Sequence, residues 1–248
     1  MTVATMKLPT EKRKATRRWI DQKFLMIGPG KVGKSAFWAE GEKTLFLEFE
    51  PGLNHLNVLA QPLRTWDELK ELYLLLKDAD ANTFPYDTIV FDTVDRMVDL
   101  ATEEVIANGR RKYAKMAQDI NGVGDVPNGA GWAWQKELIS NVLRKFEELP
   151  AASVLIGHWN NKEIKEPTRT YHRDTISISG QTGMKIIHWA DHTLHVRVTT
   201  AGDTQERLVL ARPTATVEAG SRGELVPPVT KWSPDMHANY QALRQLFN

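Results

Sequence analysis

The stretch that most constrains the fold is GPGKVGKS, residues 28–35, which fits the pattern G-x-x-x-x-G-K-[ST]. It follows the apolar run KFLMIG (23–28) and precedes the helical segment AFWAEG (36–41). Glycines let successive backbone N–H groups turn inward around phosphate oxygens, and a helix N-terminus adds a favourable dipole. A glycine-rich turn without a ligand is the alternative, but this strand-to-helix context favours a phosphate-binding P-loop. The predicted ATP-binding residues of the turn are Gly28, Pro29, Gly30, Lys31, Val32, Gly33, Lys34 and Ser35.

Further apolar runs predict the rest of a sheet. They are KTLFLEFE (43–50), YDTIVFD (86–92), ASVLIGH (152–158), HTLHVRV (192–198) and ERLVLA (206–211). Continuous apolar runs without alternation are typical of strands covered on both faces, as in a parallel sheet. Apolar residues recur at helical spacing between the runs, over 66–76 and 134–146. We therefore expect an α/β fold with a mainly parallel sheet flanked by helices. The last two strands should form an antiparallel C-terminal extension, and PPVTKWSPD (227–235) a connector into a short helix.

Composition limits the classes of protein. The chain has 248 residues, 42% of them apolar and 25% charged, which is ordinary for a globular protein. Its formal net charge of +1 argues against a surface that is basic all over, as for nucleic acid, but not against a local basic stripe. The absence of cysteine excludes disulfides and thiolate chemistry. We find neither a membrane-spanning run nor a secretory signal, and expect a cytoplasmic protein with no membrane partner.

The N-terminus differs in charge from the rest. Residues 1–23 contain seven lysines and arginines but only two acids. We therefore divide the chain into a basic N-terminal segment, 1–22, and one core domain, 23–248. The segment is either a solvated leader or an arm that binds a partner or nucleic acid.

Acidic residues at strand ends complete the predicted site. Lys34 would reach the β- and γ-phosphates, and the Ser35 hydroxyl would coordinate Mg²⁺. Asp92 ends the run TIVFD and is the expected second group for Mg²⁺, with a turn or helix-capping role as the alternative. Glu48 and Glu50 share one side of a strand, but Glu50 stands at its end, before a Pro-Gly turn. Glu50 is therefore the better candidate for the base that activates water, unless it is only a surface turn residue.

The run ending at His158 should open into the same crevice, because ligands bind at the carboxyl ends of parallel strands. His158 could sense the γ-phosphate there. The next residues, WNNKEIKEPTRTYHRD (159–174), have neither helical nor strand period, which predicts a loop. Cations that track phosphates and aromatic rings that stack on bases are what single-stranded nucleic acid requires. The loop carries both, although Glu163 and Glu166 lower its net positive charge. A solvated loop without a ligand is the alternative. Its cations and rings are Lys162, Lys165, Arg169, Arg173, Trp159, Tyr171 and His172.

The order of these parts resembles a known family. The P-loop is followed by LEFEPGL (47–53), IVFDTV (89–94) and LIGHW (155–159). This order is similar to the RecA-type recombinase core, and most closely to the phage-encoded, core-only RecA-like single-strand annealing proteins of the Sak group, over about residues 22–225. The resemblance implies a RecA-like P-loop ATPase with ATP and Mg²⁺ as ligands. It places Glu50 at the catalytic glutamate and Asp92 at the Walker B aspartate. His158 stands where recombinases usually carry a glutamine, so the chain departs from the family there.

The resemblance also implies where DNA and a second protomer would bind. Residues 160–180 fall at the second DNA-binding loop, and the glycine-rich stretch 121–131 at the first. A basic cluster precedes the latter: Arg110, Arg111, Lys112 and Lys115. In the family ATP lies between protomers, and basic residues from the neighbour reach it. The candidates here are Arg207, Arg212 and Arg222, each of which could instead be a surface salt-bridge partner.

These expectations favour an ATP-dependent protein that binds single-stranded DNA, oligomerises into a ring or filament, and promotes annealing or strand pairing in phage homologous recombination. It would be a weak DNA-stimulated ATPase in the host cytoplasm, with a single-strand-binding protein as a further candidate partner. Two other classes stay open. One is a helicase- or packaging-type motor ATPase, and the other is a nucleotide-dependent switch that binds no DNA.

Overall fold

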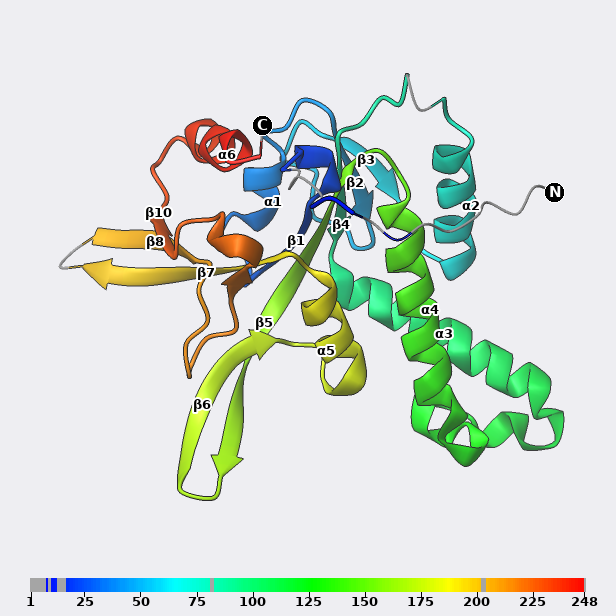
Figure 1. Cartoon of the computed structure of the whole chain (residues 1–248). Coiled ribbons are helices and arrows are strands. Elements are labelled where there is room, and N and C mark those ends of the chain that lie inside the picture. Colours follow the sequence, from blue (N-terminus) through cyan, green and yellow to red (C-terminus); the bar gives the residue numbers. More distant parts are fainter. Residues whose placement is uncertain (1–7, 9, 13–16, 81–82, 202–203, 248) are drawn as a thin grey trace.

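A computed structural model describes residues 8, 10–12, 17–80, 83–201 and 204–247 of the chain. Its strands pair side by side in the order β10-β8-β7-β1-β5-β4-β2-β3, while β6 pairs with β5 and β9 with β7 (Figure 1). Their bounds are β1 (Lys23–Gly28), β2 (Thr44–Glu48), β3 (Leu59–Pro62), β4 (Thr88–Asp92), β5 (Ala152–Glu166), β6 (Arg169–Ile176), β7 (His192–Ala201), β8 (Thr204–Leu210), β9 (Gly220–Ser221) and β10 (Val229–Lys231).

The centre of the sheet is parallel, as the sequence predicts. Strands β7, β1, β5, β4, β2 and β3 all run in one direction. β8 is antiparallel to β7, and β10 is antiparallel to β8, which confirms the antiparallel C-terminal extension. β10 lies within the stretch that the sequence predicts as a plain connector. β5 lies between β1 and β4, so the residues that end these three strands meet at one edge.

Helices cover both faces of the sheet (Figure 1). One apolar core joins alternate strand residues such as Leu25, Ile89 and Leu155 to α2, α3, α4 and α5. The other joins the intervening residues, such as Phe24 and Met26, to α1 and α6. The uninterrupted apolar runs are explained by these two cores, because each strand must bury both sides. The helices are α1 (Lys34–Trp38), α2 (Trp66–Lys77), α3 (Val94–Lys112), α4 (Ala130–Glu147), α5 (Gly180–Trp189) and α6 (Met236–Gln245).

Most of the basic N-terminal segment, residues 1–7, 9 and 13–16, lies outside the described residues. The end of the segment packs against the domain. Trp19, in a single 3₁₀ turn (Trp19–Asp21), is only 4% exposed. Its ring packs against Phe24, Trp38 and Tyr240. Trp19 and Gln22 are therefore buried against the domain that the sequence predicts to begin at residue 23.

The predicted basic loop after His158 is a β-hairpin, and this prediction was wrong. β5 continues to Glu166, and its outer half pairs antiparallel with β6, from Trp159 opposite Ile176 to Glu166 opposite Arg169. The hairpin projects from the body of the molecule (Figure 1). Polar residues on both of its sides explain the missing period, because neither face of the outer half is covered. The stretch beyond it forms α5 before the chain returns to the sheet.

The expected first DNA-binding loop is compact rather than open. Residues 121–131 form short 3₁₀ turns between α3 and α4, over Val123–Asp125 and Pro127–Gly129. Val123 and Val126 are buried in a small separate core with Val105 and Ile120. In the part of the chain that the structure describes, no helix is long and apolar enough to cross a membrane.

Candidate nucleotide-binding site

The P-loop residues form a tight turn between β1 and α1. Gly33 caps α1 and has φ +100°, a backbone conformation that side-chain-bearing residues rarely adopt. A Cβ atom placed on it would lie 3.3 Å from Cε of Met236 and 3.7 Å from Nη1 of Arg207. The positive φ is what requires glycine here, because the nearest neighbour is the flexible end of a methionine side chain. The turn leaves the N-terminus of α1 facing a pocket, which is the geometry that phosphate binding needs.

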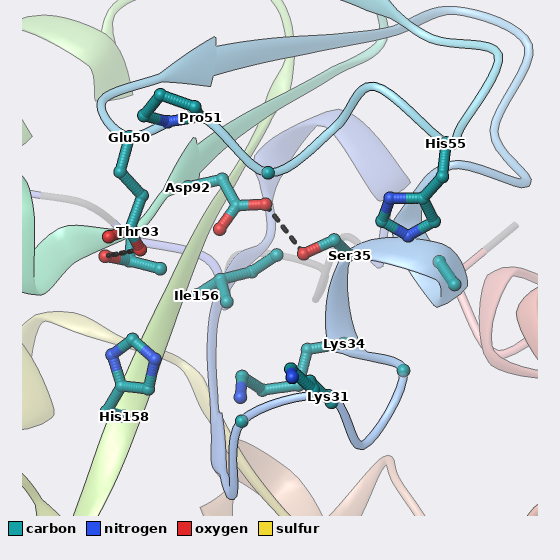
Figure 2. Close-up of a pocket in the computed structure, with 14 residues that line it drawn as sticks. Lys31, Lys34, Ser35, Glu50, Pro51, His55, Asp92, Thr93, Ile156 and His158 are labelled. Carbon is teal, nitrogen blue, oxygen red and sulfur yellow. Dashed lines mark hydrogen bonds between the residues drawn. The ribbon is translucent and has the colours of Figure 1, made fainter.

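The Lys34 side chain points back into the P-loop (Figure 2). Its ammonium donates hydrogen bonds to the carbonyl oxygens of Gly28, at 3.0 Å, and Pro29, at 2.7 Å. Lys34 is 6% exposed, and this burial lowers its pKa, against the opposing charges of Asp92 and Asp95. A buried ammonium beside the N-terminus of α1 suits a polyphosphate, because an anionic ligand would offset the cost of burying its charge.

Asp92 ends β4 and meets the other end of the P-loop. The Ser35 hydroxyl donates to its carboxylate at 2.7 Å (Figure 2). Burial raises the pKa of Asp92, and the Ser35 hydrogen bond opposes that shift. Within the described residues no three His, Cys, Asp or Glu side chains cluster as in a metal site built from protein alone. One hydroxyl and one carboxylate are nevertheless the oxygen donors that Mg²⁺ takes from protein beside substrate phosphates, so the pair fits this ion.

The two candidate glutamates occupy different environments. Glu50 lines the pocket, and its carboxylate accepts a hydrogen bond from the Thr93 hydroxyl at 3.1 Å. Glu48 turns toward the backbone instead: its Oε1 faces the N–H groups of Gly52 and Leu53 at 3.3 and 3.4 Å. Oε2 of Glu48 lies 3.9 Å from Nη2 of Arg64. Glu48 therefore braces the turn after β2, and Glu50 is the carboxylate in the pocket.

His158 lies beside the P-loop because β5 is next to β1. The two strands pair Gly28 with His158. The backbone N–H of His158 donates to the carboxylate of Asp95 at 2.9 Å, and its ring Nδ1 lies 3.4 Å from the same oxygen. The sequence reasoning missed both Asp95 and Thr93. Their signal is their place shortly after the strand-end Asp92: Thr93 follows it and lines the pocket, and Asp95 lies in the first turn of α3.

The P-loop, Glu50, Asp92 and His158 surround one pocket of about 530 Å³. Figure 2 shows Glu50 and His158 on one side, Ser35 and Asp92 in the middle, and His55 on the other. His55 is a further residue that the sequence reasoning missed. The lining residues are Gly30, Lys31, Gly33, Lys34, Ser35, Ala36, Glu50, Pro51, Gly52, His55, Asp92, Thr93, Ile156 and His158.

The three arginines considered for action on a neighbour's nucleotide lie in different places. Arg207 is beside Gly33 of its own P-loop. Arg212 is mostly exposed and lies 3.5 Å from the exposed carboxylate of Glu224. Arg222 pairs with Asp191 at 2.9 Å, at the edge where β7 and β1 begin, opposite the pocket.

The cationic side chains of the hairpin differ in exposure and in ion pairing. Lys162, Lys165 and Arg169 are exposed, and two of them are paired along the hairpin: Lys165 with Glu163 at 3.2 Å, and Arg169 with Glu166 at 2.8 Å. Arg173 is half-buried and paired with Glu218 at 3.2 Å, so it braces the hairpin against the segment that precedes β9. Arg169 lies over the ring of Tyr171, at 4.9 Å from its centroid.

The basic cluster at the end of α3 is largely engaged in local contacts. Arg110 donates to the carbonyl oxygen of Ile120 at 2.9 Å. Arg111 donates to the side chain of Asn108, and the Lys112 ammonium lies 4.9 Å from the centroid of the Trp134 ring. These contacts hold the turns between α3 and α4. The structure does not bring this cluster into the pocket.

A phosphate-binding turn and a strand-end acid on a mainly parallel sheet define a P-loop nucleotide-binding domain. The family model described as an AAA domain matches residues 20–223, so the chain belongs to this family of ATPase domains. No curated protein matches the sequence.

Two solved structures are similar to this chain. One is a KaiC-like protein from the archaeon Pyrococcus horikoshii OT3, at 13% identity and a TM-score of 0.44, with 86% of this chain and 90% of that chain covered. The other is the flagellar accessory protein FlaH from Methanocaldococcus jannaschii, at 11% identity and a TM-score of 0.45, with 86% and 84% covered.

Proposed function

We propose that this ATPase domain binds single-stranded DNA under the control of ATP and promotes strand annealing in phage homologous recombination, as a weak DNA-stimulated ATPase of the Sak group. One observation supports this most. β5 runs without a break from His158, in the nucleotide pocket, into a projecting hairpin with exposed cations and an aromatic ring. A single strand thus links the site for ATP to a surface suited to DNA.

The nucleotide half of the proposal assigns roles to residues of the pocket. Lys34 and the backbone of the P-loop hold the phosphates. Ser35 and Asp92 hold Mg²⁺, which when bound supplies positive charge against the phosphate oxygens. Glu50 accepts the proton of the attacking water, since its carboxylate lies in the pocket while that of Glu48 does not. His158 contacts the outermost phosphate.

The DNA half depends on which hairpin side chains share a face. Residues directly opposite in an antiparallel pair point to the same side. Lys162 is opposite Arg173, Ile164 opposite Tyr171, and Glu166 opposite Arg169. Lys162, Arg169 and Tyr171 therefore lie on one face, together with Glu166, which accepts hydrogen bonds from Arg169 and Tyr171. DNA phosphates would replace Glu166 as the partner of Arg169, and the ring can stack on a base.

The family resemblance further supports a homo-oligomer with the nucleotide between copies. Arg212 is then the best candidate to act on a neighbour's nucleotide. Its ion pair with Glu224 joins two exposed side chains, and such pairs contribute little. Arg207 lies beside Gly33 of its own P-loop but does not line the pocket, and Arg222 is held at the opposite edge.

The experiment is fluorescence anisotropy of a labelled oligonucleotide with Lys162→Ala/Arg169→Ala, titrated at several salt concentrations. Loss of two phosphate contacts should weaken binding and lower the slope of log K against log salt by about 1.4, or 0.7 for each contact. Lys43→Ala/Lys77→Ala is the matched control, because it removes two exposed cations away from the hairpin. Equal affinity and slope in the hairpin variant and wild type would refute the DNA surface.

The same preparations separate the other classes. Unwinding of a forked duplex by the wild type would indicate a motor ATPase. ATP binding without any affinity for single-stranded DNA would indicate a switch.

A further inference from the structure

Asp95 connects the nucleotide pocket to both legs of the hairpin, which are the outer half of β5 and β6. It lies in the first turn of α3, three residues after Asp92. One carboxylate oxygen accepts the backbone N–H of His158 at 2.9 Å. The other accepts the hydroxyl of Ser177. His158 is where β5 leaves the sheet, and Ser177 directly follows β6, so a single carboxylate contacts the two residues between which the hairpin begins and ends.

The legs are also tied to each other at this point. The backbone N–H of Ser177 donates to the carbonyl oxygen of His158 at 3.0 Å. Asp95, His158 and Ser177 thus form a three-residue junction at the root of the hairpin. A displacement of Asp95 would act on both strands of the hairpin, because each oxygen of its carboxylate accepts a hydrogen bond from a different one.

The other end of the connection is the nucleotide pocket. Asp95 is separated from Asp92 only by Thr93 and Val94. The Thr93 hydroxyl donates to Glu50 at 3.1 Å, and the Asp92 carboxylate accepts from Ser35. The charge of Asp95 is also close enough to Lys34 to oppose the burial that lowers the pKa of that ammonium. A ligand that rearranges Ser35, Asp92 or Glu50 therefore acts on a helical turn that carries Asp95.

β6, the second strand of the hairpin, is also held at Asp174 by hydrogen bonds that do not involve the pocket. The backbone N–H of Asp174 donates to the carbonyl oxygen of Thr216, and its carboxylate accepts from Arg197. These hydrogen bonds hold β6 against β7 and the segment before β9. The junction at Asp95 connects both strands of the hairpin to α3, and it adds to the direct pairing of β5 with β4 and β1 beside the pocket.

We propose that Asp95 is the positioning residue through which the bound nucleotide sets the orientation of the hairpin, by holding His158 and Ser177 together. The part of this inference that concerns affinity for DNA rests on the proposed function. The part that concerns the conformation of the hairpin does not. It predicts that Asp95 contributes to the coupling between the two ligands rather than to the affinity for either one alone.

The first arm measures that coupling. The affinity for a labelled oligonucleotide is determined with and without Mg²⁺ and AMP-PNP, in wild type and in Asp95→Ala. We expect the nucleotide to change the wild-type affinity for the oligonucleotide by about fivefold or more. In Asp95→Ala, the ratio of the affinities with and without nucleotide should be close to one. AMP-PNP affinity of the variant should stay within about twofold of wild type, since a residue that acts only on coupling leaves single-ligand affinity intact. A wild-type ratio in Asp95→Ala would overturn the proposal.

Three variants control for charge and for loss of structure. Asp99→Ala removes a carboxylate one turn further along α3, on the exposed side, and should keep the wild-type ratio. Asp95→Asn should restore most of the ratio, because its amide can accept from His158 and donate to the Ser177 oxygen. Ser177→Ala should lose the ratio as Asp95→Ala does. Failure of Asp95→Asn to differ from Asp95→Ala would count against positioning by these hydrogen bonds.

The second arm needs no DNA. Amide hydrogen exchange of peptides that cover 158–177 is measured with and without Mg²⁺ and AMP-PNP. We expect the nucleotide to change exchange at the hairpin root in wild type and not in Asp95→Ala. If wild type binds no DNA, the proposed function fails while this arm still tests Asp95. An equal nucleotide effect in both proteins, or none in wild type, would overturn the inference.

Discussion

Matched replacements of Glu50 and Glu48 by glutamine should separate catalysis from stability. Removing a general base typically costs a factor of about 100 to 10,000 in rate. Glu50→Gln should therefore lower ATP turnover by that factor, or raise the activation free energy by about 3–5 kcal/mol. The amide can still accept from the Thr93 hydroxyl, so ATP affinity and the melting temperature should stay near wild type.

Glu48→Gln should do the opposite. An amide oxygen still faces the N–H groups of Gly52 and Leu53, but the charge opposite Arg64 is lost. One weakened buried hydrogen-bonded group costs about 1 kcal/mol of unfolding free energy. In a chain of this size that lowers the melting temperature by about 2–4 °C. Turnover should change little, because this carboxylate does not line the pocket.

The assays are phosphate release at saturating ATP, equilibrium binding of a fluorescent ATP analogue, and thermal unfolding followed by circular dichroism. All three are run on both variants and on wild type. If Glu48→Gln lowers turnover more than Glu50→Gln, the base has been assigned to the wrong carboxylate. If Glu50→Gln loses ATP affinity in proportion to turnover, it acts in binding rather than in proton transfer.

Three further predictions concern single residues. Lys34→Ala removes a charge-assisted phosphate contact and should weaken ATP binding tenfold or more, by about 1.5–3 kcal/mol, and unchanged affinity in calorimetry would contradict the P-loop assignment. Tyr171→Ala should weaken oligonucleotide binding by about 1–3 kcal/mol without changing the salt slope, and a changed slope would indicate that no base stacks there. The pKa of His192 is lowered to about 4, first by burial and then by Arg222, so the unfolded chain takes up this proton first as the pH falls. Protonation of this group should therefore remove about 3 kcal/mol of stability between pH 6.5 and 4, in addition to the loss from His195, whose pKa burial also lowers to about 4. In urea unfolding, His192→Gln should make the pH dependence less steep, and an equal slope in the variant would refute the assignment.

Much of the site could be predicted from local sequence. The P-loop is a contiguous motif, and Asp92 and His158 end apolar runs whose parallel pairing brings their carboxyl ends to one edge. Glu50 could be ranked above Glu48 because it stands last before Pro51. Each of these predictions depends on residues a few positions apart, where strand period and turn chemistry decide the outcome.

The hairpin could not be predicted in this way. Its residues have no clear alternation, because the outer half of β5 and the first part of β6 are largely exposed. What makes them strands is pairing between positions such as Ile164 and Tyr171, together with the contact of Asp174 with Thr216. Cross-strand pairs and long-range hydrogen bonds leave no periodic signal in either segment alone.

The junction at the hairpin root shows the same limit most clearly. Asp95 lies 63 residues from His158 and 82 from Ser177 in the chain. The motif around Asp92 shows that a chain leaves a strand there, but not that its next carboxylate meets the end of another strand. Only the placement of β5 between β1 and β4 brings the three residues together, because strand order is set by packing of the whole sheet and not by any one segment.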